Sequence, residues 1–161
     1  QDGRIFRDGV ASTCNPAKAH PGITGVGTQH AFQTFTFFNN LSTCITVNFD
    51  PNPGTGNDCG VGAHLSAYLG SYDPNNQAAN YLGDVGSSTT QPFSFAAPAG
   101  STIVLVASSN AAAPLTCNFN LSSNELSVAA IPTLSPMALT GLALVLGLFG
   151  VAYTQRYLRR S

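Results

Sequence analysis

The C-terminal part of the chain contains one long segment without charge. No charged side chain occurs between Leu126 and Gln155, and the apolar stretch from Met137 to Gln155 is nineteen residues long. A helix rises about 1.5 Å per residue, so roughly 20 residues cross the hydrocarbon core of a bilayer. A helix buried in a protein core would be shorter or would carry a polar face. The segment therefore predicts a transmembrane helix over residues 136–155.

The residues after this segment predict its orientation. Arg156, Arg159 and Arg160 lie on one flank only, and such residues stay on the cytoplasmic side of a membrane. We therefore expect residues 156–161 to be a basic cytoplasmic end and the preceding domain to lie outside. Because an exported domain needs a signal peptide, we also expect one to have been removed ahead of Gln1.

The predicted helix carries small residues on one face. Ala143, Gly147 and Gly150 are spaced i, i+4 and i+7, and small side chains let membrane helices approach closely. Such residues are also common in membrane spans in general, so docking on another helix and a plain span both stay open. Tyr153 and Tyr157, near the arginines, suit the aromatic belt at the membrane interface. We expect the lipid bilayer and an integral-membrane protein complex as partners.

The part of the chain ahead of the helix is poor in charge and slightly acidic. It holds three basic and seven acidic side chains, a formal charge of −4, and the three arginines of the tail bring the whole chain to −1. Because no basic cluster occurs there, nucleic acid is excluded as a partner. About 130 residues are enough for one domain with its own core.

All four cysteines, Cys14, Cys44, Cys59 and Cys117, lie ahead of the predicted helix. An even number on the outer side of a membrane predicts two disulfides. Three pairings are possible. Cys44 and Cys59 flank one predicted strand and loop, so we favour that pair, which leaves Cys14 with Cys117. Metal ligation is the alternative, but no C-x-x-C motif occurs and the histidines lack ligand spacing.

Short strands separated by turns fill residues 31–124. The runs rich in alternating, β-branched or aromatic residues are 32–38, 44–49, 64–69, 81–82, 93–95, 101–108 and 117–121. Ile45, Val47 and Phe49 share one strand face, and the apolar run 101–108 suits the middle of a sheet. These features predict a mainly β fold, an antiparallel β-sandwich, followed by the transmembrane helix.

Two flanking segments and the aromatic residues complete this prediction. Residues 1–30, rich in glycine, proline and threonine, predict an irregular leader, and residues 125–135 a short linker. The predicted strands 32–38 and 93–95 contain six phenylalanines: Phe32, Phe35, Phe37, Phe38, Phe93 and Phe95. Alternation predicts that most are core and that a subset faces outward as an apolar docking patch.

No catalytic constellation occurs in the sequence. A hydrolase needs a nucleophile beside an oriented base, yet there is no G-x-S-x-G motif. His64, on a predicted strand, is better interpreted as a packed or surface residue than as a base. Most acidic residues stand next to glycine, proline or asparagine, where they act as turn formers. We therefore expect no enzyme activity and no cofactor.

Calcium binding is a weaker alternative for two groups of residues. The first group contains Asp50, Asn52, Asn57 and Asp58. Their spacing departs from the D-x-[DN]-x-[DN]-G pattern of calcium loops. The second group is Asp73 and Asp84, in the similar segments YLGSYD and YLGD. Plain turns explain both groups better, so no metal site is predicted.

The tail carries a recognisable motif. The segment Ile131-Pro132-Thr133-Leu134-Ser135, then a hydrophobic span and a basic end, resembles the IPTL-type C-terminal sorting signal of Gram-negative bacteria. This resemblance covers about thirty residues. It implies a sorting enzyme of the exosortase type, which can cleave and re-anchor such proteins. It also implies a bacterial inner-membrane protein with a periplasmic N-terminal domain.

The preceding domain looks like the β-sandwich repeats of secreted bacterial proteins that carry such tails. The similar stretches are AYLGSYDP (67–74), NYLGDVGSS (80–88) and FSFAAPAGSTIVLVAS (93–108). Such modules are extracellular and have no known chemistry of their own, so the resemblance implies a role in contact between molecules.

Two functions fit these features. The first is a non-enzymatic accessory subunit that docks on and stabilises a larger membrane complex, for example a respiratory or photosynthetic one, from the periplasmic side. The alternative is an exosortase-sorted surface or matrix protein whose sandwich serves adhesion or assembly. The charge-poor domain and the small-residue helix face favour the first, and the family resemblance favours the second. A secreted enzyme or a calcium-dependent lectin needs a site that the sequence does not show.

Overall fold

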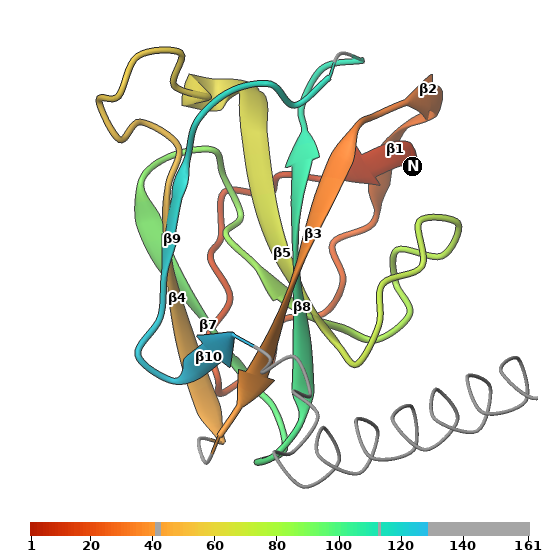
Figure 1. Ribbon diagram of the computed structural model, residues 1–161. Coiled ribbons are helices and arrows are strands. Elements are labelled where there is room, and N and C mark those ends of the chain that lie inside the picture. Colours follow the sequence, from red (N-terminus) through yellow and green to blue (C-terminus); the bar gives the residue numbers. More distant parts are fainter. Residues whose placement is uncertain (41–42, 113, 129–161) are drawn as a thin grey trace, which may run out of the picture. The chain divides into compact units, whose positions relative to one another are not determined.

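The strands predicted between residues 31 and 124 form two antiparallel sheets (Figure 1). The computed structural model describes residues 1–40, 43–112 and 114–128, which belong to one compact unit, Gln1–Ala129. The strands are β1 (Asp2–Ile5), β2 (Ile23–Gln29), β3 (Phe32–Asn39), β4 (Cys44–Asp50), β5 (Ala63–Leu69), β6 (Tyr81–Asp84), β7 (Gln91–Ala96), β8 (Thr102–Ser109), β9 (Asn120–Ser122) and β10 (Leu126–Val128), with a 3-10 turn, η1 (Gly60–Gly62), before β5. The sheet orders are β10-β3-β8-β5-β6, β7-β4-β9 and β1-β2. The mainly β, antiparallel prediction is confirmed.

The two larger sheets enclose the main core between them. Ile45, Val47 and Phe49 of β4 are fully buried, which confirms the alternation predicted for this strand. Phe95 of β7 and Leu105 of β8 belong to the same hydrophobic cluster, so both sheets contribute to one core. Burial of a side chain of this size contributes about 1.5–3 kcal/mol to stability. The core therefore holds the two sheets face to face.

Strand β8 lies in the centre of the larger sheet, between β3 and β5, as its apolar run predicts. Leu105 belongs to the core between the sheets. Val104 and Val106 belong to a second cluster with Ile5 of β1 and Tyr68 of β5. Because alternate residues of a strand point to opposite faces, both faces of β8 are covered. This explains why the run is continuously apolar instead of alternating.

The prediction that residues 1–30 form an irregular leader is wrong. β1 and β2 pair with each other, and the stretch between them reaches both larger sheets. The Ser12 amide donates a hydrogen bond to the Asp84 carbonyl (3.0 Å), and the Ser94 amide donates one to the Ser12 carbonyl (2.9 Å). One segment thus joins β6, an edge strand of one sheet, to β7, an edge strand of the other. This N-terminal segment is ordered by hydrogen bonds to residues that are distant in sequence. A local sequence pattern cannot reveal such contacts.

The four cysteines form two disulfides, as predicted, but the favoured pairing is wrong. The bonded pairs are Cys14–Cys44 and Cys59–Cys117. Cys44 begins β4, whose seven residues span about 20 Å at roughly 3.3 Å per residue. Cys59 stays beyond the other end of β4, where the Gly60 amide donates to the Pro51 carbonyl (3.0 Å). A Cys44–Cys59 bridge would need Cα atoms within about 7 Å, so it is excluded.

The C-terminal boundaries also differ from the prediction. The last predicted strand, 117–121, is observed as β9 at Asn120–Ser122, and β10 lies within the predicted linker, paired with Phe37–Asn39 of β3. The predicted membrane helix, its small-residue face, the basic end and the sorting motif lie outside the described residues. Among residues 1–40, 43–112 and 114–128, no helix is long and apolar enough to span a bilayer.

Replacing Gly86 with alanine is expected to lower the free energy of unfolding by about 2 kcal/mol or more. Gly86 has φ +72°, and a Cβ there would lie 2.3 Å from the backbone carbonyl of Val10. Urea denaturation measures the loss. Gly100→Ala is the control, because Gly100 has φ +76° but open space around a Cβ, so only the backbone cost of about 1 kcal/mol applies. Equal losses would show that Val10 does not lie against Gly86.

Candidate functional site

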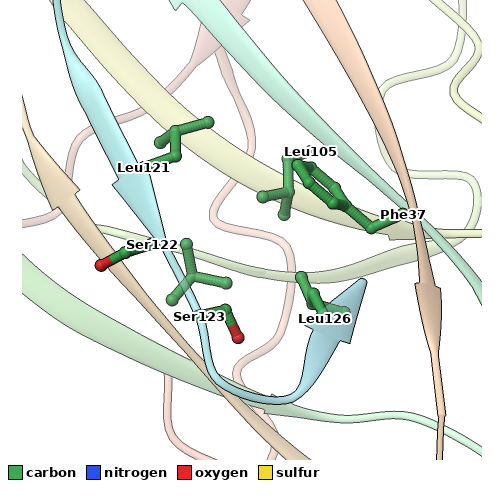
Figure 2. Close-up of a pocket in the computed structure, with 7 residues that line it drawn as sticks. Phe37, Leu105, Leu121, Ser122, Ser123 and Leu126 are labelled. Atoms are coloured by element: carbon green, nitrogen blue, oxygen red, sulfur yellow. The ribbon is translucent and has the colours of Figure 1, made fainter. Parts of the chain in front are cut away.

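In the part of the chain that the structure describes, one lateral side of the sandwich is open between β3 and β9. A pocket of about 180 Å³ lies there, lined by Phe37, Val47, Leu105, Leu121, Ser122, Ser123 and Leu126. Figure 2 shows Leu121 and Ser122 on one side of the pocket, Phe37 and Leu126 on the other, and Leu105 behind them. Its lining carries no charged side chain, so the pocket suits an apolar group.

A second, more open pocket adjoins the first and shares Phe37 and Leu121 with it. Its other lining residues are Gln33, Phe35, Pro53, Thr55, Cys117, Asn118, Phe119 and Asn120. Phe35 and Phe119 meet edge to face at 5.9 Å between ring centroids. We call the two pockets together the β3–β9 groove. It offers apolar rings with polar but uncharged side chains around them.

The backbone along one wall of this groove is available for pairing. Ala31 accepts a hydrogen bond from the Ser109 amide, and the Asn39 amide donates one to Ser101. Antiparallel bonding alternates along a strand, so Phe32, Thr34 and Thr36 direct their backbone groups away from β8. Among the described residues, β10 pairs only with Phe37–Asn39. The edge from residue 32 to residue 36 therefore has no neighbouring strand in the described part of the chain.

The phenylalanines divide between core and surface as alternation predicts. Phe93 and Phe95 are buried in the core, and Phe35 and Phe37 are half-buried toward the groove. Phe32 and Phe38 are 37% and 39% exposed, which confirms that a subset faces outward. Phe32 packs edge to face on Tyr72. A docking role for this exposed pair stays a prediction.

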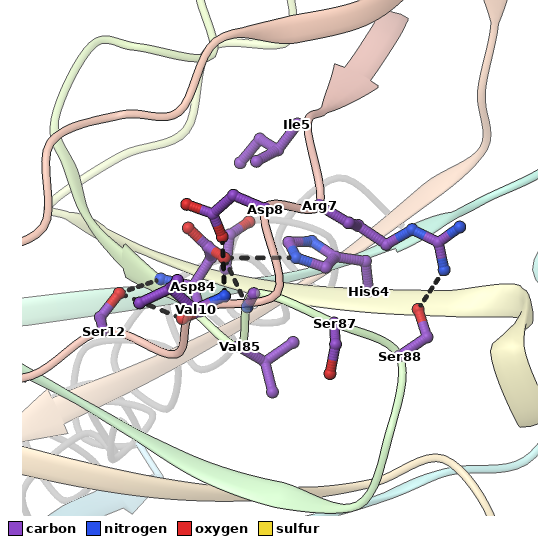
Figure 3. A network of polar contacts seen from close by, with 12 residues as sticks. Ile5, Arg7, Asp8, Val10, Ser12, His64, Asp84, Val85, Ser87 and Ser88 are labelled. Carbon is purple, nitrogen blue, oxygen red and sulfur yellow. Dashed lines mark hydrogen bonds and ion pairs between the residues drawn. The ribbon is translucent and has the colours of Figure 1, made fainter.

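The opposite side of the sandwich holds a buried polar network around Asp84 (Figure 3). The Lys18 Nζ lies 3.0 Å from Asp84 Oδ2, 3.1 Å from Asp84 Oδ1 and 2.8 Å from Asp8 Oδ1. The Gly86 amide donates to Asp84 Oδ1 at 2.6 Å, and the Tyr81 hydroxyl donates to Asp84 Oδ2. The side chain of Asp84 has no exposed surface, and that of Lys18 is 11% exposed. Several hydrogen bonds and ion pairs therefore stabilise the buried charges of Lys18 and Asp84.

His64 reaches the same carboxylate from β5. Its Nε2 lies 3.4 Å from Asp84 Oδ1, and the residue is 1% exposed. This position bears out the packed alternative for His64. Neither ring nitrogen has a hydrogen-bond partner within the described part of the chain. The Nε2–Oδ1 contact lies at the long end of the hydrogen-bond range, and it is among the contacts that stabilise the Asp84 carboxylate.

Two titrating groups in the network are shifted by their surroundings. Burial alone would raise the pKa of Asp84, but His64, Tyr81 and Lys18 hold that pKa below its usual value. Burial, together with the nearby carboxylate of Asp84, raises the pKa of the Tyr81 hydroxyl. Tyr81 therefore stays protonated and remains a hydrogen-bond donor to Asp84.

The other acidic residues organise turns, as the turn interpretation predicts. Asp50 Oδ1 accepts from the Asn52 amide (2.9 Å), Asp58 Oδ2 from the Gly54 amide (2.9 Å), and Asp73 Oδ1 from the Asn75 amide (2.9 Å). Asp73 is exposed, whereas Asp84 is buried, so the second calcium pair is not brought together. Within the described ranges, no group of three or more His, Cys, Asp or Glu side chains could hold a metal ion.

These features define a disulfide-bonded antiparallel β-sandwich. The N-terminal segment joins one of its lateral sides, and the other side is open as far as residues 1–40, 43–112 and 114–128 are concerned. No protein-family model, curated protein or solved structure matches the chain. The geometry of the two lateral sides is therefore the guide to the function of this protein.

Sequence reasoning missed the network because its members have no motif spacing. Lys18 lies in the stretch expected to be an irregular leader, and the sequence around Asp84 indicates only a turn or a calcium ligand. One signal was present: Lys18 is the only lysine of the chain. A lone lysine in a charge-poor domain is a reasonable candidate for a structural contact, but the sequence does not identify its partner.

Proposed function

We propose that this protein is an exported, membrane-anchored module without enzymatic activity that docks on a larger membrane complex. The single observation that supports it best is the edge of β3 from residue 32 to residue 36, which has no neighbouring strand among the described residues and lies beside the uncharged β3–β9 groove. An extended segment of a partner can add to such an edge through main-chain hydrogen bonds, while its side chains enter the pockets. Two disulfides and a predicted membrane helix are typical of a protein that functions outside the cytoplasm.

The expected occupant is an uncharged, extended segment of the partner protein with one or two apolar side chains. Phe37, Leu105 and Leu126 line the smaller pocket, which is large enough for an aliphatic side chain. The rim residues Gln33, Asn118 and Asn120 can hydrogen-bond to a main chain. A charged peptide would lose hydration there without gaining an ion pair, so it is disfavoured.

Replacing Thr34 with proline is expected to abolish association with the complex. Proline lacks an N–H, and Thr34 directs this group outward, so the variant should lose a bond to the partner but none to β8. Native membranes are extracted in mild detergent, separated by size, and the chain is analysed by intact mass. The wild type should migrate full length with a large complex, and Thr34→Pro should migrate alone.

Thr34→Val is the matched control, because it keeps the N–H and the β-branched shape, and it should associate like the wild type. Comigration of Thr34→Pro with the complex would overturn docking through this edge. The accessory-subunit proposal itself would fail if the wild type were recovered alone.

The second candidate is a sorted surface protein, and the resemblance of residues 131–135 to a sorting signal supports it. It predicts a mature chain that ends near Leu134. The same intact-mass measurement separates the two functions, because a full-length species favours the accessory subunit and a truncated species in the surface fraction favours sorting.

A further inference from the structure

The contact between Lys18 and Asp84 joins the N-terminal segment to the end of β6 in a site with little access to water. The ammonium nitrogen lies within 3.1 Å of both carboxylate oxygens. It also donates to the Val10 carbonyl at 2.5 Å, which fixes its position further. Because both carboxylate oxygens lie this close to Nζ, the carbon between them, Cγ, also lies close to Nζ. Holding an amine and a carboxyl group together in this way turns a slow bimolecular reaction into an intramolecular one.

We propose that Lys18 and Asp84 condense to an intramolecular isopeptide bond, a secondary amide between Lys18 Nζ and Asp84 Cγ. The product would be a covalent staple between the N-terminal segment and β6. It goes beyond the docking function and does not depend on it.

The reaction is a condensation that releases one water molecule. A proton first passes from the Lys18 ammonium to Asp84 Oδ2, 3.0 Å away, which leaves a neutral amine and a neutral carboxyl group. The amine then attacks Asp84 Cγ, a C–N bond forms, and the bond from Cγ to Oδ2 breaks. Counted from the ammonium and the carboxylate, Nζ loses two protons, and both leave with Oδ2 as water. No oxidant, reductant or other reactant is needed.

The neighbouring groups have suitable roles for this step. Asp8 Oδ1, 2.8 Å from Nζ, can accept a proton from the amine and pass it on. The Tyr81 hydroxyl donates to Oδ2, the oxygen that leaves. The Gly86 amide, 2.6 Å from Oδ1, stabilises the negative charge that develops on that oxygen when Cγ becomes tetrahedral.

Burial favours the amide over the ion pair. In water, hydration stabilises the separate charges, but Asp84 has no exposed side-chain surface and has lost that hydration. The neutral amide avoids the cost of two buried charges. Burial also keeps water away from the product, so hydrolysis of the bond is suppressed.

Digestion with trypsin tests the bond directly. The full-length chain is exported so that its disulfides form, and is then denatured, reduced, alkylated and digested. Trypsin cleaves after a lysine only when the amine is free, and the next lysine or arginine after Lys18 is Arg156. The expected result is that the peptide Asp8–Lys18 is not released, and that the fragment starting at Asp8 extends past Asp84 with a mass one water molecule below its sequence.

Lys18→Arg is the matched control, because arginine keeps the positive charge and the trypsin site but its guanidinium does not form this amide. This variant should release the peptide covering residues 8–18 at the full sequence mass. Full release of Asp8–Lys18 from the wild-type chain would overturn the proposal and leave an ordinary ion pair. Because the wild type itself gives the decisive result, the test does not depend on whether a variant folds.

Discussion

Replacing Asp84 with alanine is expected to lower the free energy of unfolding by about 3–5 kcal/mol. The substitution removes the partner of Lys18, whose side chain is only 11% exposed, and leaves the Tyr81 hydroxyl and the Gly86 amide without their acceptor. A buried charge that loses its partner costs more than the pair itself contributes. Urea denaturation followed by circular dichroism measures the change in midpoint.

Asp73→Ala is the control for this prediction. Asp73 lies in the similar segment YLGSYD, is exposed, and accepts one hydrogen bond from the Asn75 amide. The Asp73→Ala variant should lose less than about 1 kcal/mol of its free energy of unfolding. Comparable losses for the two variants would mean that Asp84 is not buried against Lys18. An ion pair and an isopeptide bond both predict a loss for Asp84→Ala, so only the trypsin digestion distinguishes them.

Removing either disulfide is expected to lower the free energy of unfolding by about 4 kcal/mol. The pairs Cys14–Cys44 and Cys59–Cys117 are separated by 30 and 58 residues. In the chain-entropy description, a crosslink that closes a loop of this length lowers the conformational entropy of the unfolded chain, which stabilises the folded state by about 3.5–4 kcal/mol. Domains of this size are stable by only about 5–15 kcal/mol, so either loss should leave a marginal fold.

The measurement uses pairwise substitution by serine, so that no single thiol is left to form a wrong bridge. Denaturation midpoints of Cys14→Ser/Cys44→Ser and Cys59→Ser/Cys117→Ser are compared with the wild type. Peptide mapping without reduction should find the same two pairs. A Cys44–Cys59 peptide would contradict the observed pairing.

The strands that could be predicted are those whose pattern is local. In β4 every second residue is buried, and β8 is apolar throughout because both its faces are covered. Such patterns depend only on the face that each residue presents, so a short stretch of sequence contains the whole signal. The antiparallel sheet content followed from these strands together.

The elements that could not be predicted depend on partners far along the chain. Residue 12 is ordered by residue 84, 72 positions away, and no spacing rule connects them. The disulfide pairing failed for the same reason, because Cys44 and Cys59 are close in sequence but lie beyond opposite ends of β4. The β3–β9 groove follows from which edges stay unpaired, and that is a property of the assembled sheets.

The contact between Ser12 and Asp84 also bears on the order in which the chain folds. Because a chain is synthesised from its N-terminus, residue 12 is made before residue 84 and must wait for β6 before its hydrogen bonds can form. Contacts between distant residues slow folding, because loop closure costs entropy before any contact is gained. Until that moment Val104, Val106 and Tyr68 lack the cover of Ile5. The late docking of the earliest residues is thus the step at which this domain is most exposed to aggregation and proteolysis.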